Sequence, residues 1–121
     1  MTKEIKIGTQ IIAVEANAAT PIRFRNLFGK DLLTTVQEGT RENGIDLTVA
    51  SEIAPELAFL MAKTAEKADL SKLNQNQFFD WLEQFGPLDM VNATEAIFTA
   101  YFGDASTLVD SKKKEGKRKE N

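Results

Sequence analysis

The sequence predicts a mostly α-helical domain of the α+β class, with about five helices and a short N-terminal β-hairpin. Residues 3–7 alternate polar and apolar side chains, as a half-buried strand does. Most other apolar residues recur at helical spacing, between Pro, Gly, Ser and Asn residues that can begin or end helices. The 121 residues, 42% hydrophobic and 27% charged, have the size and balance of one globular domain, which we assign to residues 1–110.

The predicted hairpin joins residues 3–7 to residues 10–16. Gly8-Thr9 can supply the tight turn, and β-branched residues are frequent in both strands. A two-stranded ribbon is only marginally stable alone, so it must pack on helices or pair with another chain. Its free edge is therefore a candidate assembly contact, although a cover over the core is the simpler expectation.

A short helix is expected over residues 21–28. Thr20 can cap its start, Pro21 suits its first position, and Gly29 can end it in a left-handed conformation. The residues expected on its inner face are Phe24, Leu27 and Phe28.

A second short helix is expected after a sharp corner. Asp31 can cap it, and Gly39 and Asn43-Gly44 weaken and end it. Residues 45–50 are ambiguous between a short strand and an extended lead-in to the next helix. The residues expected on the inner face of this second helix are Leu32, Leu33 and Val36.

A longer helix is expected over residues 52–68, with Ser51 as its cap and Pro55 at about its first turn. Phe59 lies among the charged residues of its outer face, so either a wide core wraps around this ring or the ring contacts a partner. The residues expected on its inner face are Ile53, Leu57, Leu60, Met61 and Thr64.

The pair Asn74 and Gln77 has the spacing of a capping box, and it predicts a helix from there to Phe85, which Gly86-Pro87 stops. The broad apolar face of this helix consists of Phe78, Phe79, Trp81, Leu82 and Phe85.

The last helix is expected over residues 88–102, with Gly103 as the cap beyond its end. Its apolar face is wide for a surface helix, so we expect it to be the central helix of the domain. The alternative is that another subunit covers part of this face. The large residues of the face are Met90, Val91, Ile97, Phe98, Tyr101 and Phe102.

The net charge of −3 is unevenly distributed along the chain. Residues 1–31 have a net charge of +2, residues 32–110 of −9, and residues 111–121 of +4. Because residues 111–121 contain no apolar side chain, we expect a disordered basic tail there. Such a tail either contacts nucleic acid or keeps the chain in solution, and the acidic body makes nucleic acid the less favoured partner.

The composition disfavours most enzymes. The sequence contains no Cys and no His, which removes the thiol nucleophile, the disulfide, and the commonest general base and transition-metal ligand. It has no Gly-rich phosphate loop and no calcium-loop pattern. No apolar run is long enough to cross a bilayer, and the first residues do not resemble a signal peptide. We therefore expect a cytoplasmic protein that is not an enzyme, with no cofactor, no metal and no membrane partner.

Two motifs follow one another in the chain. The first is TPIRFRNLFGKDLL at residues 20–33, with an aromatic-Arg-x-x-Phe-Gly-x-Asp pattern, and the second is LAFLMAK at residues 57–63. The segment FFDWL at residues 78–82 and a last amphipathic helix come next. Over about residues 1–103, this order is similar to that of phage tail assembly chaperones, as in siphophages (siphoviruses) and prophages of Gram-positive bacteria.

The resemblance implies a non-catalytic role in virion assembly. Such a chaperone binds the tape measure protein, keeps it soluble and promotes tail tube assembly around it, in the host cytoplasm and outside the mature virion. Further partners implied are the tail tube protein, a longer form of the chain made by −1 ribosomal frameshifting, and other copies of the chain in a homo-oligomer. The residues Ser111-Lys112-Lys113 are compatible with a slippery codon run.

Five residues are candidate partner contacts: Arg23, Arg25, Phe59, Tyr101 and Phe102. The two arginines point in different directions on their short helix, so each either pairs with a group of the same chain or recognises a partner. The three aromatic residues belong to faces with surplus apolar surface. The alternative function is a small regulatory or adaptor module whose basic tail contacts nucleic acid or an acidic partner.

Overall fold

The computed structural model describes residues 2–41, 44–46 and 49–103, and it confirms a mostly helical fold with an N-terminal antiparallel hairpin. The predicted basic tail, residues 111–121, lies outside these residues, as do residues 104–110 of the predicted domain. The elements are β1 (Lys3–Ile7), β2 (Gln10–Val14), α1 (Thr20–Phe28), α2 (Leu32–Gly39), β3 (Thr40–Arg41), β4 (Gly44–Ile45), the π-helical turn η1 (Val49–Ile53), α3 (Ala54–Ala65), the 3₁₀ turn η2 (Leu70–Lys72), α4 (Gln75–Leu82), α5 (Asp89–Asn92) and α6 (Thr94–Phe102).

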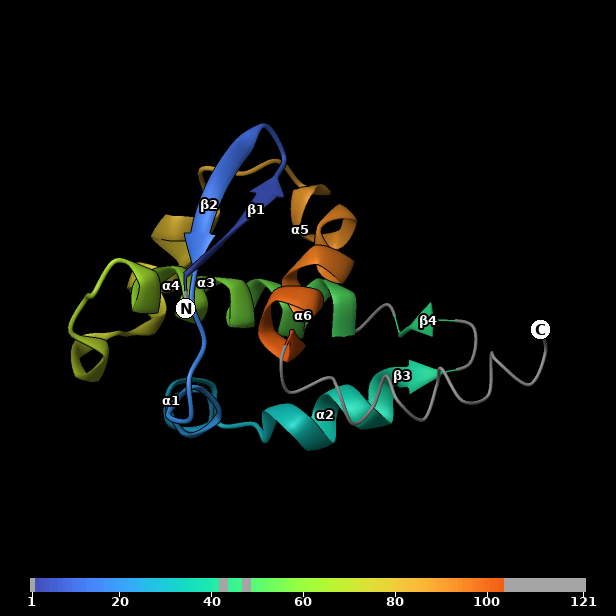
Figure 1. Ribbon diagram of the computed structural model, residues 1–121, viewed down its shortest axis with the longest axis horizontal. Coiled ribbons are helices and arrows are strands. Elements are labelled where there is room, and N and C mark those ends of the chain that lie inside the picture. Colours follow the sequence, from blue (N-terminus) through green and yellow to red (C-terminus); the bar gives the residue numbers. More distant parts are fainter. Residues whose placement is uncertain (1, 42–43, 47–48, 104–121) are drawn as a thin grey trace.

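Helix α3 is the centre of the domain. Nine of its twelve residues are buried, including all the inner-face residues expected within it, because other elements cover it on several sides. The hairpin lies above it and α1 and α2 lie below it, while α4, α5 and α6 pack around it (Figure 1). The expectation that residues 88–102 form the central helix is wrong, since α6 packs on one side of α3.

The hairpin covers α3 through its alternate side chains. Ile7 and Val14 are buried, and the backbone N–H of Glu15 donates to the carbonyl of Met61 in α3 at 3.0 Å. Gly8 supplies the turn with φ +63°, and a Cβ there would collide with the carboxylate of Asp89. The predicted strands and turn are confirmed, although β2 ends at Val14.

The corner between α1 and α2 forms largely as predicted. Gly29 ends α1 with φ +72°, and its N–H donates to the carbonyl of Arg25 at 2.8 Å. Asp31 caps α2, because its Oδ1 accepts from the N–H of Thr34 at 3.1 Å. Thr20 is not the cap of α1: it is already helical, and its hydroxyl accepts from the N–H of Asn17 at 2.9 Å.

The predicted entry to α3 is wrong in detail. Ser51 does not cap the helix, because it lies inside the π-helical turn η1. Pro55 lies in the first turn of the helix as expected, at the second position of α3, where its missing N–H costs no intrahelical hydrogen bond. The ambiguous segment 45–50 contributes to both β4 and η1, and residues 47 and 48 lie outside the described residues.

The C-terminal helices begin as the sequence pattern predicts and differ from it further on: α4 already ends at Leu82, before the expected Phe85. The capping box of Asn74 and Gln77 is confirmed, with both reciprocal hydrogen bonds at 2.9 Å. The expected helix 88–102 is broken at Ala93, which gives six α-helices among the described residues. Gly103 follows the end of α6 as expected, but with φ −34° it is not a left-handed cap.

Candidate functional surface

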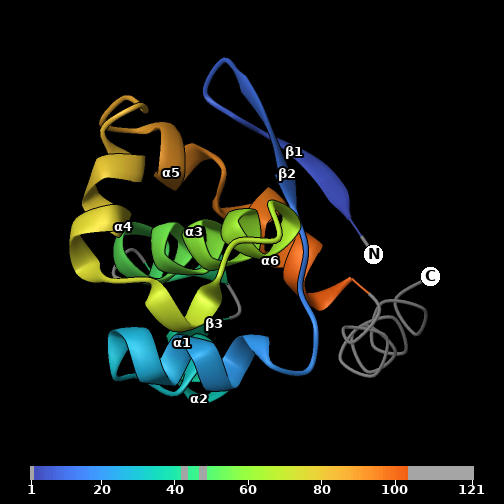
Figure 2. The same ribbon diagram turned by 90° about the vertical axis from the view of Figure 1, so that its left-hand side faces the viewer.

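The α1–α4 apolar surface, which we define as Leu27, Phe28 and Phe79, is the first candidate for partner binding. The side chain of Phe79 is 54% exposed, and Leu27 and Phe28 are half-buried. Helices α1 and α4 lie on the same side of the molecule, the side that faces the viewer in Figure 2. The amide of Gln75, at the start of α4, donates to the carbonyl of Leu27 at 3.1 Å, so the two helices are directly joined.

An aromatic cluster connects this surface to the core. The ring of Phe79 lies 5.3 Å from that of Phe78, which lies 5.2 Å from Phe28 and 5.4 Å from the buried Phe59. Ring contacts at these separations are favourable and restrict side-chain rotation. Phe79 is therefore an exposed aromatic ring that is connected to the core through its contact with Phe78.

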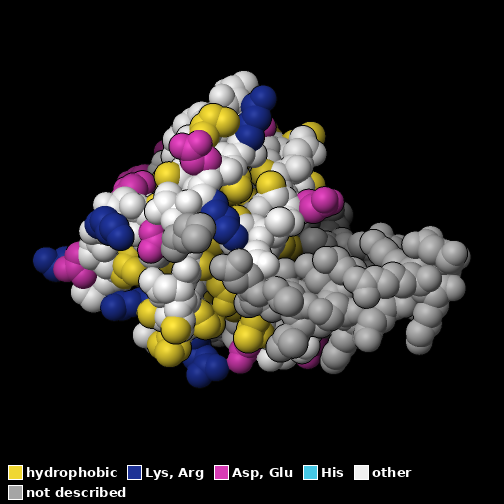
Figure 3. Space-filling model, in the orientation of Figure 1, with side chains coloured by type: hydrophobic (Ala, Val, Ile, Leu, Met, Phe, Trp, Pro, Cys, Tyr) yellow, Lys and Arg dark blue, Asp and Glu magenta, His cyan; other side chains and the backbone are white. Residues whose placement is uncertain are grey.

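Other large apolar side chains are also exposed. On α1 and α2 they are Ile22 and Leu33, and near the hairpin turn they are Ile11 and Leu88. In Figure 3 a group of hydrophobic side chains is visible over α1, with charged side chains around it. The expectation that Leu33 and Phe79 face the core is wrong. Each follows a more deeply buried neighbour by one position, which turns it about 100° towards the rim of its helix.

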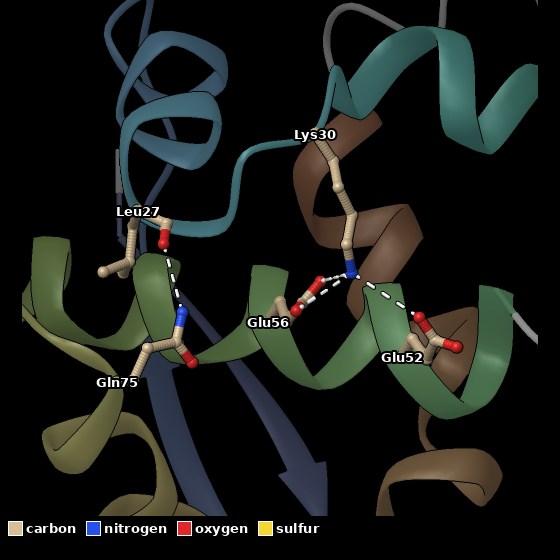
Figure 4. A network of polar contacts seen from close by, with 5 residues as sticks. All are labelled: Leu27, Lys30, Glu52, Glu56 and Gln75. Atoms are coloured by element: carbon tan, nitrogen blue, oxygen red, sulfur yellow. Dashed lines mark hydrogen bonds and ion pairs between the residues drawn. The ribbon is translucent and has the colours of Figure 1, made fainter.

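A polar network fixes α1 and α2 on α3 (Figure 4). The ammonium of Lys30, in the corner, lies 2.9 Å from the carboxylate of Glu56 and 3.6 Å from that of Glu52. Burial raises the pKa of Glu56, and the hydrogen bond and charge of Lys30 oppose this rise. The corner is thus held on the central helix independently of the apolar contacts.

The two candidate arginines have neighbours within the chain. Arg25 is largely exposed and forms a 3.2 Å ion pair with Asp31. The pKa of Asp31 is lowered, chiefly by the hydrogen bond from the N–H of Thr34 and also by Arg25. Arg23 is half-buried, and its charge contributes to the lowered pKa of Asp69, for which hydrogen bonds from Ser71 are the main cause. The alternative of internal pairing is thus realised for Arg25.

The three candidate aromatic residues differ in burial. Phe59 is 0% exposed, and its ring packs on Phe78 and Trp81, so the prediction that it contacts a partner at the surface is wrong and the wide core accounts for it. Tyr101 and Phe102 are half-buried, and their rings meet edge to face at 4.9 Å. Burial raises the pKa of Tyr101. These last two residues are accessible in part and lie at the end of α6.

A groove between β1 and α6 was not anticipated from the sequence. It has a volume of about 640 Å³ and is open to solvent. The strand contributes Lys3, Glu4 and Ile5 to its lining, and α6 contributes Ala96, Thr99 and Ala100. No local pattern could have revealed it, because its two walls come from opposite ends of the described chain.

No metal-binding cluster is present among the described residues. Within residues 2–41, 44–46 and 49–103, no group of three or more His, Cys, Asp or Glu side chains could hold a metal ion. In the same residues, every buried side-chain nitrogen or oxygen has a hydrogen-bond partner. None of the helices described is long and apolar enough to cross a membrane.

The comparisons with known proteins give no relative for this chain. No family model matches it, and no curated protein or solved structure matches it either.

Proposed function

We propose that this protein is a tail assembly chaperone that binds the tape measure protein of a phage tail through the α1–α4 apolar surface. The observation that carries the proposal is Phe79, a half-exposed aromatic ring held in place by a cluster that reaches the core. An ordered aromatic anchor binds a partner at little cost in side-chain entropy, which is the usual property of an interface hot spot.

The client that suits this surface is an amphipathic helix. A helical apolar stripe presents side chains at i, i+3, i+4 and i+7, and these can pack on Phe79 and on the half-buried Leu27 and Phe28. Residues 32–110, which include Phe79, have a net charge of −9, and residues 1–31, which include Leu27 and Phe28, have a net charge of +2. The α4 side of the surface therefore favours Lys and Arg beside the stripe. A long tape measure helix with such stripes would aggregate alone, and many chaperone copies would keep it in solution by mass action.

The resemblance of residues 20–33 and 57–63 to tail assembly chaperones agrees with this proposal. The first motif forms α1 and the corner that follows, and the second lies in the central helix α3. The proposal keeps the non-catalytic role, the host cytoplasm as the place of action, and the tail tube protein and a frameshifted longer form as further partners. The Lys-rich segment on which the frameshift depends lies outside the described residues.

Co-expression tests the proposal. The chain is produced together with the tape measure protein encoded in the same tail gene cluster, and the soluble fraction is purified through a tag on the chain. We expect the tape measure protein to be soluble only with the chain and to co-purify with it. Phe79→Ser should abolish this effect. Leu88→Ser removes another exposed apolar side chain, beside the hairpin turn, and should leave the effect intact. An insoluble client beside the wild-type chain, or equal losses in the two variants, would refute the proposal.

A further inference from the structure

The backbone groups and charges along the outer edge of β1 are complementary to those of an identical strand that runs in the opposite direction. Strand β1 pairs with β2 only, in the two-stranded sheet described here, and Ile7 opposite Gln10 closes the two-residue turn. In such a hairpin the residues facing the turn are hydrogen-bonded to each other, and the pairs alternate along the strands. The N–H and C=O groups of Lys3, Ile5 and Ile7 therefore point to β2, whereas those of Glu4 and Lys6 point outward.

These outward groups are unused by the rest of the described chain. None of the backbone hydrogen bonds between described elements reaches Glu4 or Lys6. In Figure 2, β1 lies at the margin of the molecule. Both side chains are exposed and lie on the face of the hairpin opposite to the buried Ile7. Strand β1 thus offers two donors and two acceptors symmetrically placed about Ile5.

We propose that a second copy of this chain pairs with this edge, β1 antiparallel to β1, with Ile5 opposite Ile5 about a two-fold axis. In this register Glu4 stands opposite Lys6 of the second copy, and Lys6 stands opposite its Glu4. Opposite charges directly across an antiparallel pair are favourable, and like charges are unfavourable. Pairing centred on Glu4 or on Lys6 would place identical charges opposite each other, so the charge pattern selects the Ile5 register.

The groove beside β1 provides the space for this contact. Ile5 is only half-buried and lines the groove, whose other wall combines the small side chains of Ala96, Thr99 and Ala100 with Gly103 and the polar Asn92 and Glu95. In the proposed register Ile5 and its copy form a non-hydrogen-bonded pair, in which side chains approach most closely. The small residues of α6 leave room for the second isoleucine, and the two hairpins form one four-stranded sheet, which is more stable than a two-stranded ribbon.

A charged edge strand often serves to prevent pairing. A single lysine in an edge strand disfavours pairing in every register. It stands opposite either the lysine of the other copy, which repels it, or an uncharged residue, which offers no charge attraction. A glutamate and a lysine two positions apart face like charges in the registers centred on Glu4 and on Lys6, and opposite charges in the register centred on Ile5. The edge of β1 therefore favours a closed dimer and disfavours open-ended addition of strands.

Sedimentation equilibrium of the full chain, without any client, tests the dimer. The wild-type chain should dimerise, and Glu4→Lys or Lys6→Glu should each weaken self-association on the order of tenfold or more, because each replaces two attractions by two repulsions. The two variants mixed should associate with each other, since one then carries two lysines and the other two glutamates. The double variant E4K/K6E should dimerise as the wild type does.

The control variant is Glu83→Lys, an equal change of net charge on an exposed residue of the α4 end. It should leave the dimer unchanged, and thermal unfolding should show all these variants folded. A wild-type chain that is monomeric at its highest soluble concentration would overturn the proposal, as would a dimer insensitive to the reversals or a mixture that fails to associate. Because no client takes part, these outcomes are independent of the tail assembly function.

Discussion

The ammonium of Lys30 and the carboxylate of Glu56 form a 2.9 Å ion pair, and the side chain of Glu56 is only 13% exposed. The pair joins the α1–α2 corner to the central helix, and Glu52 approaches the same ammonium at 3.6 Å. Burial of Glu56 works against its charge and raises its pKa, and Lys30 offsets part of that cost. Loss of the Lys30 side chain and loss of the Glu56 charge should therefore destabilise the fold by different amounts.

Replacement of Lys30 by Met should cost more stability than replacement of Glu56 by Gln. Lys30→Met leaves a poorly exposed carboxylate without its cation, and we expect a loss of about 1–2 kcal/mol, less than for a fully buried pair. Glu56→Gln removes the charge whose burial is unfavourable, so its loss should be smaller. Urea unfolding at neutral pH measures both, and the reverse order would contradict this account of the pair.

Asp31 should make stability depend on acid pH. Its pKa is lowered in the folded chain from its ordinary value of 3.8, so its ionised form stabilises the fold above that pH. The contribution is lost as the pH falls through the folded pKa. The melting temperatures of the wild type and of Asp31→Asn should therefore differ at pH 7 and converge on strong acidification. A difference that stays constant down to the acid limit would exclude this role.

Gly8 and Gly29 should respond differently to alanine. Both have positive φ, +63° and +72°, and alanine in that conformation costs about 1 kcal/mol. At Gly29 a Cβ would meet nothing within 4 Å, whereas at Gly8 it would collide with the Asp89 carboxylate. That carboxylate also accepts from the N–H of Gly86 at 2.7 Å, so it cannot move freely. Thermal unfolding should show the larger loss for Gly8→Ala, and equal losses would contradict the collision.

Substitutions at Phe59 and at Phe79 should show that the stability of the fold and the binding of the client depend on different residues. Phe59→Ala empties a site in the core and should cost about 3–5 kcal/mol. Phe79→Ser removes a ring that is half in solvent, and its loss of stability should be below about 1 kcal/mol. Only the second change should reduce client capture by a chain that remains folded. Calorimetry combined with the co-expression assay distinguishes them, and a large melting-temperature drop for Phe79→Ser would assign that ring to the core.

Local rules predicted the caps whose partners lie within three or four residues. The capping box at Asn74 and Gln77 and the caps at Gly29 and Asp31 depend on such neighbours only. Thr20 failed as a cap because Asn17 competes for its hydroxyl, an interaction that the cap rule does not consider.

The break in the last helix lies at Ala93, a residue that hydrophobic periodicity does not mark. The hydroxyl of Thr94 donates to the carbonyl of Met90 at 3.0 Å, and Ala93 departs from helical angles with φ −94° and ψ 1°. The apolar pattern of residues 88–102 continues through this point, so hydrophobic periodicity alone predicted one helix.

The candidate surfaces could not be predicted from the sequence, because they depend on which faces of the helices and strands pack against one another. The Phe79 ring lies on the rim of an apolar face and is exposed, because the neighbouring elements leave that rim uncovered. The groove needs β1 and α6 to meet, and the pair Lys30 and Glu56 needs the corner to fold onto α3. Periodicity ranks the side chains of one helix by direction but contains no information on the neighbouring element.

The contact between β1 and α6 determines when this domain can finish folding. Lys3 donates to the carbonyl of Ala100, 97 positions further along the chain, and the hairpin has few other elements to pack against besides α3 and α5. On the ribosome, the hairpin is made before its neighbours on α6. Closing so long a loop is entropically costly until the whole core is present. The edge of β1 should thus remain without its supporting helix until α6 has left the exit tunnel.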